Sequence, residues 1–129
     1  MNIENETILD VNKIVEMKEE LGSSFANILG NFRAGLRLRP ESIRQALEEK
    51  NSKRMSMESH SLKSTCRQLG LLRMGKVAEY LEQISDTGNL TGAEEMVQRL
   101  FDEMELANKE LDKNLLIVHK PKPFFDKAT

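Results

Sequence analysis

His60 lies in the middle of a segment, Ser59 to Ser64, in which a lysine and several small residues surround one imidazole. On a helix, which turns by about 100° per residue, Leu62 and Leu69 fall on the side opposite the histidine, so the imidazole points outward from the apolar stripe. An accessible imidazole beside a cation suits attack on a large partner, and we expect the chemistry to be phosphoryl transfer. Five side chains lie within about 60° of His60 on this helix: Ser56, Met57, Lys63, Ser64 and Arg67.

Glu82 is the residue best placed to orient that imidazole. If two antiparallel helices join in a turn at about residue 71, His60 and Glu82 each lie roughly 16 Å from the turn and stand at the same height. The carboxylate can then accept a hydrogen bond from one ring nitrogen and fix the tautomer. The other ring nitrogen would stay unprotonated and face solvent. The alternative interpretation of Glu82 is an ordinary solvated glutamate.

Hydrophobic periodicity predicts that these residues belong to a series of helices. In the first helix, Ile8, Val11, Ile14 and Val15 are expected to point inward. Pro40 either kinks the second helix or starts a new segment. The expected spans are residues 7–20, a segment from Ser23 or Ser24 to Leu47, residues 52–69, a helix carrying Met74 to Ile84, and a last helix from a Thr91–Glu94 capping box to about residue 116.

Chain reversals between these helices predict an antiparallel arrangement. Gly70 allows the backbone to turn after the helix that carries His60, and residues 86–89 read as a loop. We therefore expect an all-α fold, an up-and-down four-helix bundle with an additional N-terminal helix. The predicted domain covers residues 1–117. The remaining segment, residues 118–129, contains Pro121 and Pro123 and is expected to be a mobile tail.

Composition limits the compartment and the partners of the chain. It has 129 residues, one cysteine, an acidic N-terminus and no apolar run long enough to cross a bilayer, so we expect one cytoplasmic domain that has no disulfide and does not associate with a membrane. Residues 33–76 carry 11 Lys/Arg against four Asp/Glu, whereas residues 77–112 carry two against ten. The basic block contains His60 and favours a negatively charged partner. Nucleic acid is a weaker interpretation, because this block lacks the aromatic side chains that stack on bases.

The segment from Ser59 to Gly70 resembles the phosphoacceptor helix of histidine-containing phosphotransfer (HPt) domains. The family pattern has Leu and Lys two and three residues after the histidine, then Gly, two small residues, and a further Gly. The resemblance extends more loosely over about residues 8–115. The residues that fit the pattern are His60, Leu62, Lys63, Thr65, Cys66, Gly70 and the Leu81–Glu82 pair of the following helix.

Ser64 is the main departure from the family pattern, since most members have glycine there. The family uses a small residue at this point so that a receiver domain can approach the imidazole. Serine adds only a hydroxymethyl group, and some members similar to quorum-sensing phosphotransfer proteins also have it. The departure bears on docking affinity and leaves the chemistry intact.

The resemblance implies a stand-alone, monomeric phosphocarrier. His60 would accept a phosphoryl group from the phospho-aspartate of a hybrid sensor kinase's receiver domain and pass it to a response regulator. Lys63 would offset the added charge, and Glu82 would orient the ring. The chain would need no cofactor, because Mg²⁺ would belong to the partner's acidic site. It would have no ATP-dependent kinase activity, because no glycine-rich phosphate loop is present. The residues expected to contact the receiver are Ser56, Met57, Ser64, Arg67 and Gln68.

Two rival interpretations use the same residues differently. A helical adapter could dock a receiver domain or a sensor kinase without being phosphorylated, and a small helical protein could use the basic block to bind nucleic acid or another anionic surface. Met57, Arg67 and Gln68 could equally be ordinary surface residues. Cys66 is expected to be a half-buried core residue with no catalytic role. No Cys/His/carboxylate group in the sequence has the spacing of a metal site.

Overall fold

The computed structural model describes residues 2–118, and every regular element in that part of the chain is helical. None of these helices is long and apolar enough to cross a membrane. The elements are α1 (Val11–Leu21), α2 (Phe25–Glu48), α3 (Ser52–Leu69), α4 (Leu72–Thr87) and α5 (Ala93–Val118), with short 3-10 turns at Ile3–Asn5 and Gly22–Ser24.

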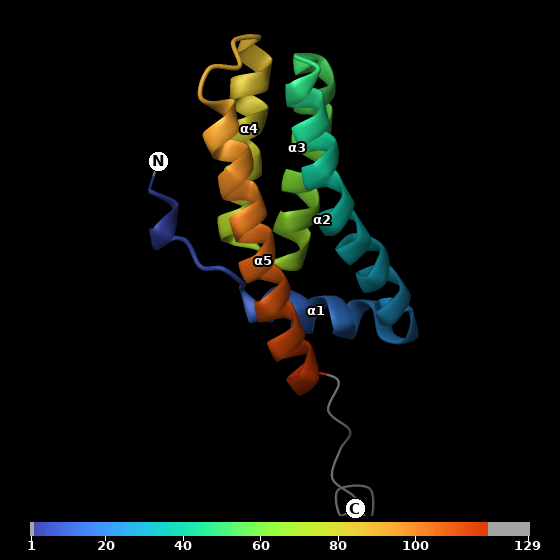
Figure 1. Cartoon of the computed structure of the whole chain (residues 1–129). Helices are drawn as coiled ribbons and strands as arrows, with labels where there is room; N and C mark the ends of the chain where they lie inside the picture. Colours follow the sequence, from blue (N-terminus) through green and yellow to red (C-terminus); the bar gives the residue numbers. More distant parts are fainter. Residues whose placement is uncertain (1, 119–129) are drawn as a thin grey trace, which may run out of the picture.

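Helices α2 to α5 run alternately up and down as a four-helix bundle, and α1 lies across the end where α2 begins (Figure 1). Short connections link the bundle helices, so that sequence neighbours pack side by side. The predicted all-α bundle with an additional N-terminal helix is confirmed. Helix α5 continues to Val118, so the predicted tail lies outside the described residues from position 119 onward.

The core lies between α2, α3, α4 and α5, where each helix contributes an apolar stripe at helical spacing. Aliphatic side chains dominate it, together with methionine and alanine. The apolar side chains at helical spacing in α4 and α5, among them Met74, Ile84, Met96 and Met104, lie in this core or pack against it. Those that are fully buried include Leu36, Ile43, Met55, Leu62, Leu69, Met74, Leu81, Leu100 and Leu111.

The first helix is shorter than the sequence suggests. It begins at Val11 because Asp10 caps it, with the Asp10 side chain accepting from the Asn12 amide at 3.2 Å. Ile14 is fully buried as expected, but Val15 is 38% exposed, so its predicted inward placement is wrong. Because α1 packs across the end of the bundle along a narrow stripe, only one flank of its apolar residues is covered.

Two local predictions about helix ends and breaks are also corrected. Helix α2 continues through Pro40, which is buried inside it, so the alternative in which Pro40 starts a new segment is wrong. The proline has no N–H to donate to the Leu36 carbonyl, yet the helix persists on tertiary packing. Helix α5 begins at Ala93, and the Thr91 hydroxyl donates to Asn89 Oδ1 at 2.7 Å, so the predicted capping box is absent.

A buried ion-pair cluster joins the start of α4 to α5 and to the N-terminal segment. The carboxylate of Glu103 is almost fully buried and lies 2.9 Å from Arg73 and 3.2 Å from Arg99. Arg99 also pairs with Glu4 at 2.5 Å. Because both arginines share one buried carboxylate, the cluster holds the base of α4 at a defined height against α5.

Candidate functional site

Helix α3 presents His60 to solvent on an otherwise well-anchored helix. Asn51 caps its start by accepting from the Arg54 amide at 3.0 Å, and Met55 and Leu62 are fully buried. The His60 side chain is 63% exposed. The imidazole is therefore accessible to a globular partner, while its helix is fixed by the core beneath it.

Gly70 sets the register that brings His60 opposite α4. It ends α3 in the left-handed conformation, with φ of 79°. A Cβ there would lie 2.5 Å from the Asp10 carbonyl oxygen and 2.9 Å from Lys13 Cβ, and the Gly70 carbonyl accepts from the Asp10 amide at 2.8 Å. Only glycine satisfies both the conformation and the close approach of the chain that leads into α1.

His60, Glu82 and Lys63 form one connected group across α3 and α4. Nδ1 of His60 lies 2.6 Å from Oε2 of Glu82, and Nζ of Lys63 donates to Oε1 of the same carboxylate at 2.5 Å. With Nδ1–H as the donor, Nε2 keeps its lone pair and faces away from Glu82. The contact that the helical register predicts between His60 and Glu82 is present in the structure.

The Glu82 carboxylate is ionised under ordinary conditions. Partial burial raises its pKa, but the hydrogen bonds from Lys63 and His60 together outweigh burial and lower the pKa below its ordinary value of 4.5. A charged carboxylate is the form that can accept from both neighbours at once. Glu82 therefore holds the ring as a permanent acceptor near neutral pH.

Lys63 lies closer to α4 than its spacing from His60 alone indicates. Its side chain is only 17% exposed and its ammonium contacts Glu82. The sequence contained the signal for this contact, because the antiparallel register that pairs His60 with Glu82 also brings Lys63 to the same height within one turn.

The other residues predicted to contact a partner follow the outer side of α3. Met57 is 62% exposed, and Ser64 is also exposed. Ser56 donates from its hydroxyl to Asp86 Oδ1 at 2.5 Å, and Arg67 lies 3.0 Å from Glu79 Oε2. These two contacts to α4 were not anticipated. The register that pairs His60 with Glu82 places Ser56 opposite Asp86, whereas Glu79 lies about one turn along α4 from the position opposite Arg67.

Gln68 and Arg67 border a hollow of about 520 Å³ where α1, α2 and α3 meet. Its walls combine half-buried apolar side chains with charged residues of α1. No periodicity of a single helix could have revealed it, because three helices form it together. It is lined by Lys13, Glu16, Met17, Glu20, Leu21, Ile28, Phe32, Arg67 and Gln68.

Neither a reactive cysteine nor a metal-binding cluster is found at the site in the described part of the chain. Cys66 is fully buried, contrary to the half-buried position expected for it, and burial raises the pKa of its thiol to about 12. The thiolate needed for nucleophilic attack is therefore not formed near neutral pH. Among residues 2–118, no group of three or more His, Cys, Asp or Glu side chains could hold a metal ion.

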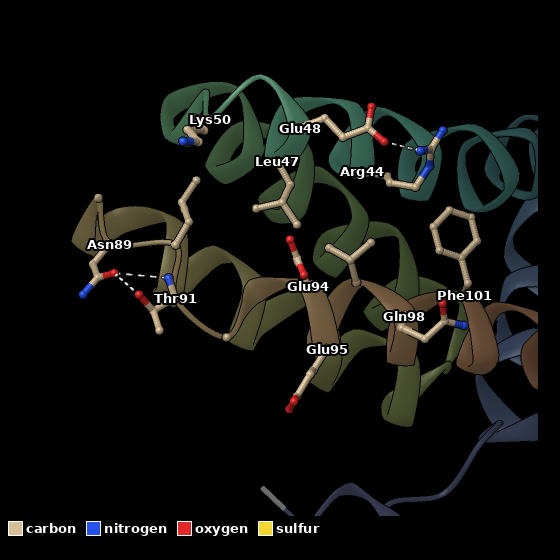
Figure 2. A pocket seen from close by; sticks show the side chains of 14 residues that line it. Arg44, Leu47, Glu48, Lys50, Asn89, Thr91, Glu94, Glu95, Gln98 and Phe101 are labelled. Atoms are coloured by element: carbon tan, nitrogen blue, oxygen red, sulfur yellow. Dashed lines mark hydrogen bonds and ion pairs between the residues drawn. The ribbon is translucent and has the colours of Figure 1, made fainter.

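A second hollow, of about 890 Å³, lies between α2 and α5, the other two helices of the bundle. Figure 2 shows Leu47 of α2 pointing toward α5 and Phe101 of α5 pointing toward α2, with an Arg44–Glu48 ion pair at the rim. Three carboxylates, those of Glu48, Glu94 and Glu95, line it. Its lining includes neither histidine nor cysteine, so the candidate site remains the group around His60.

Comparison with known proteins agrees with the fold. A family model described as Hpt domain matches residues 27–113, a range that includes His60 and Glu82. The chain is similar in structure to histidine-containing phosphotransfer protein B (HptB) from Pseudomonas aeruginosa PAO1, with a TM-score of 0.78 and 17% sequence identity. The match covers 84% of this chain and 95% of that one. At this identity the likeness supports the fold. No curated protein sequence matches the chain significantly.

Proposed function

We propose, from the premise that this chain belongs to the Hpt domain family and carries out histidine phosphotransfer in phosphorelay signalling, that Nε2 of His60 is the atom that accepts the phosphoryl group. The observation that supports this most directly is the 2.6 Å contact between Nδ1 of His60 and Glu82. It leaves Nε2 as the free nitrogen on a side chain that is 63% exposed.

In the transfer step, the Nε2 lone pair attacks the phosphorus of a phospho-aspartate on a receiver domain. A nitrogen–phosphorus bond forms while the acyl phosphate's phosphorus–oxygen bond breaks, and its electron pair leaves with the aspartate carboxylate. The ring gains positive charge as the new bond forms, and the ionised Glu82 on Nδ1–H stabilises that charge. Transfer to a second receiver reverses these bond changes, so the protein acts as a carrier.

Lys63 contributes a positive charge about one helical turn from His60. Through its contact with Glu82 it holds the carboxylate in place, and the same charge offsets part of the negative charge that the phosphoryl group adds. The phosphoryl group would sit on a largely exposed ring, where a pairing with a lysine contributes only about 1 kcal/mol, so Lys63 modulates the transfer and is not indispensable. In this proposal Mg²⁺ is held by the carboxylates of the partner receiver domain.

The partners in this proposal are the receiver domain of a hybrid sensor histidine kinase and that of a response regulator, with this chain as a monomer between them. Ser56, Met57, Ser64 and Arg67 lie on the outer side of α3 around His60, so a receiver placed over the imidazole would meet them. Receiver domains are the established interaction partners of the family; the choice among them is open to direct measurement.

The test is phosphoryl transfer from a panel of radiolabelled receiver domains to the wild type, to His60→Gln and to His119→Gln, which replaces the other of the two histidines in the sequence. We expect acid-labile, base-stable label on the wild type and on His119→Gln, and none on His60→Gln. His60→Gln should keep the wild-type melting temperature, because the replaced side chain is largely exposed. Wild type that binds a receiver yet never takes label would overturn the carrier role in favour of a docking adapter.

A further inference from the structure

The polar side chains that surround His60 on α3 fall on two sides of the imidazole. Three of them, Ser56, Lys63 and Arg67, lie about 20–60° round the helix from it, in the direction of α4. Each of these three contacts a carboxylate of α4. The polar groups on this side of the ring are therefore already engaged by the neighbouring helix.

Nε2 of His60 faces the opposite side. Because Nδ1 contacts Glu82 of α4 at 2.6 Å, the other ring nitrogen is directed away from α4. On that side of α3, Ser64 lies about 40° and Met57 about 60° round the helix from His60. A phosphoryl group on Nε2 would be placed over this side, where the thioether of Met57 has no hydrogen-bond donor.

The hydroxyl of Ser64 is free to bind such a group. Ser64 is exposed, and its hydroxyl makes no hydrogen bond to any residue among those that the structure describes. Residues four apart on a helix have Cβ atoms about 5–6 Å from each other. Side chains on a helix also lean toward its N-terminus, so the Ser64 hydroxyl is directed over the turn that carries His60. The serine thus offers a donor within reach of a group bound to Nε2.

A phosphoryl group on Nε2 would need donors on this side. It carries negative charge on three acceptor oxygens, and a hydrogen bond to a charged acceptor is about twice as strong as one between neutral groups. The ammonium of Lys63 contributes charge, but its short contact is to Glu82 on the side of α4. Ser61 lies about 100° round the helix from His60 and does not share its face. Among the described side chains of α3 within one turn of His60, Ser64 is thus the donor that is neither bound to α4 nor turned away from Nε2.

We propose that the hydroxyl of Ser64 donates a hydrogen bond to a phosphoryl oxygen on Nε2 of phosphorylated His60 and so stabilises the phosphorylated protein. The proposal rests on the proposed function for the atom that carries the phosphoryl group. It gives Ser64 a role in the phosphorylated state in addition to the contact with a receiver expected for it. A glycine at this position would leave that oxygen to water, so the serine shifts the transfer equilibrium toward this protein.

The transfer equilibrium separates this role from a role in docking. Transfer exchanges the acyl phosphate's phosphorus–oxygen bond for the phosphorus–nitrogen bond at Nε2, and the aspartate carboxylate takes the electron pair of the broken bond. The equilibrium constant depends only on the free proteins before and after transfer. A contact made only in the complex therefore changes the forward and reverse rates by the same factor, whereas a hydrogen bond to the phosphoryl group changes their ratio.

The variants are Ser64→Ala, which removes the hydroxyl, and Ser64→Thr, which keeps one, with Ser61→Ala as the matched control on the same helix. Neither position lies in the core, so all three variants should fold and melt near the wild type. The probe is the receiver from the panel that transfers fastest to the wild type. It is mixed with each variant at concentrations low enough that little complex is present, and forward and reverse rates are measured.

We expect Ser64→Ala to lower the equilibrium constant for phosphorylation of His60 about three- to tenfold. Ser64→Thr should stay closer to the wild type than Ser64→Ala does, and Ser61→Ala should leave the constant unchanged. Forward and reverse rates that change by the same factor in Ser64→Ala would overturn the proposal and assign Ser64 to docking alone. An equal fall of the constant in Ser64→Ala and Ser64→Thr would overturn it too, since the hydroxyl would not be the group responsible.

A measurement without a receiver distinguishes this proposal from the proposed function. Phosphoramidate phosphorylates histidine directly: the bond from phosphorus to Nε2 forms as the donor's own phosphorus–nitrogen bond breaks and ammonia leaves. We expect the ³¹P resonance of phosphorylated His60, identified by its absence in His60→Gln, to shift in Ser64→Ala and to remain unchanged in Ser61→Ala. If receivers never label the wild type, the carrier role fails, while that shift still supports the hydrogen bond. An identical ³¹P resonance in wild type and Ser64→Ala would overturn the hydrogen bond, even where transfer from receivers proceeds normally.

Discussion

The α3–α4 pair and the α2–α5 pair are both antiparallel neighbours in one bundle, but they are packed differently. Between α3 and α4, small residues allow close approach: a Cβ at Gly75 would lie 3.2 Å from Cys66 Cβ, and Cys66 and Ala78 are fully buried. Between α2 and α5, the half-buried Leu47 and Phe101 border a hollow of about 890 Å³. The pair that carries the chemistry is the closely packed one.

Close packing at α3–α4 has a direct consequence for the site. The contacts from His60 and Lys63 to Glu82 are 2.6 Å and 2.5 Å long, so a shift of about 1 Å between the helices would break both of them. A loosely packed pair could not maintain that distance. Residues of the α2–α5 hollow take no part in these contacts, so this half of the bundle tolerates looser packing.

The two helix pairs should differ most in how far the free energy of unfolding falls when one of their leucines is replaced by alanine. Leu81→Ala removes a fully buried side chain and should lower the free energy of unfolding by about 3 kcal/mol. Leu47→Ala, at the edge of the hollow, should lower it by about 1 kcal/mol, because water already reaches that side chain. Urea unfolding of both variants measures the contrast. Equal losses would mean that the hollow is closed in solution.

The turns that begin and end α4 give a second contrast at matched backbone conformation. Gly70 and Gly88 have φ of 79° and 75°, but only at Gly70 would a Cβ collide with the Asp10 oxygen and Lys13, while nothing lies within 4 Å at Gly88. Gly88→Ala should cost about 1 kcal/mol for the left-handed conformation alone. Gly70→Ala should cost about 2–3 kcal/mol, because the N-terminal segment must also move.

If Gly70→Ala alters the α3–α4 register as well, the ¹⁵N chemical shifts of the His60 ring nitrogens should change, because Nδ1 loses its acceptor. Gly88→Ala is the control and should leave those shifts as in the wild type. Identical losses of stability in the two variants would show that the close approach of Asp10 to Gly70 does not restrict the turn.

The carboxylate at the centre of the α3–α4 contact makes a smaller, pH-dependent contribution. Since folding lowers the pKa of Glu82 from 4.5, the ionised form adds stability that is fully present above about pH 5 and is lost as the pH falls through the folded-state pKa. Glu82→Gln should therefore lower the free energy of unfolding by about 1 kcal/mol at pH 7. The difference from wild type should shrink toward zero in acid.

Urea unfolding of wild type and Glu82→Gln at pH 7, 5 and 3.5 checks the sign. Glu79→Gln is the matched control on the same helix, since it removes more exposed ion pairs to Arg67 and Lys76 and should change stability by less than about 0.5 kcal/mol. A Glu82→Gln difference that grows in acid would contradict the assignment of the ionised carboxylate as the stabilising form.

The sequence predicts the closely packed half of the molecule better than the other. Helix α3 has the predicted bounds because Asn51 and Gly70 are strong helix-end signals. With that turn in place, antiparallel register alone pairs His60 with Glu82. The contacts of Lys63 and Ser56 to α4 follow from the same register and could have been predicted with it.

The features that the sequence did not reveal depend on how separate helices pack against one another. The exposure of Val15 depends on how α1 crosses the bundle end, and the burial of Cys66 on how closely Gly75 approaches it. The α2–α5 hollow and the α1–α2–α3 hollow depend on the splay of whole helices. Leu38, which lies within an apolar-rich helix, could be recognised as exposed only once its neighbours Leu36 and Pro40 were seen in the core.

The smallest expected effects reverse sign between two helical glycines. Gly30 in α2 has nothing within 4 Å of its Cβ position, so Gly30→Ala should raise the free energy of unfolding by about 0.5–1 kcal/mol through backbone entropy. Gly75→Ala gains the same helix propensity but drives a methyl group to 3.2 Å from Cys66 Cβ, which can retreat only by moving α3. We expect a net loss of about 1 kcal/mol. Thermal unfolding of both variants measures the difference. Stabilisation by Gly75→Ala would show that α3 and α4 can separate slightly. The 2.6 Å contact between His60 and Glu82 should then be longer in that variant.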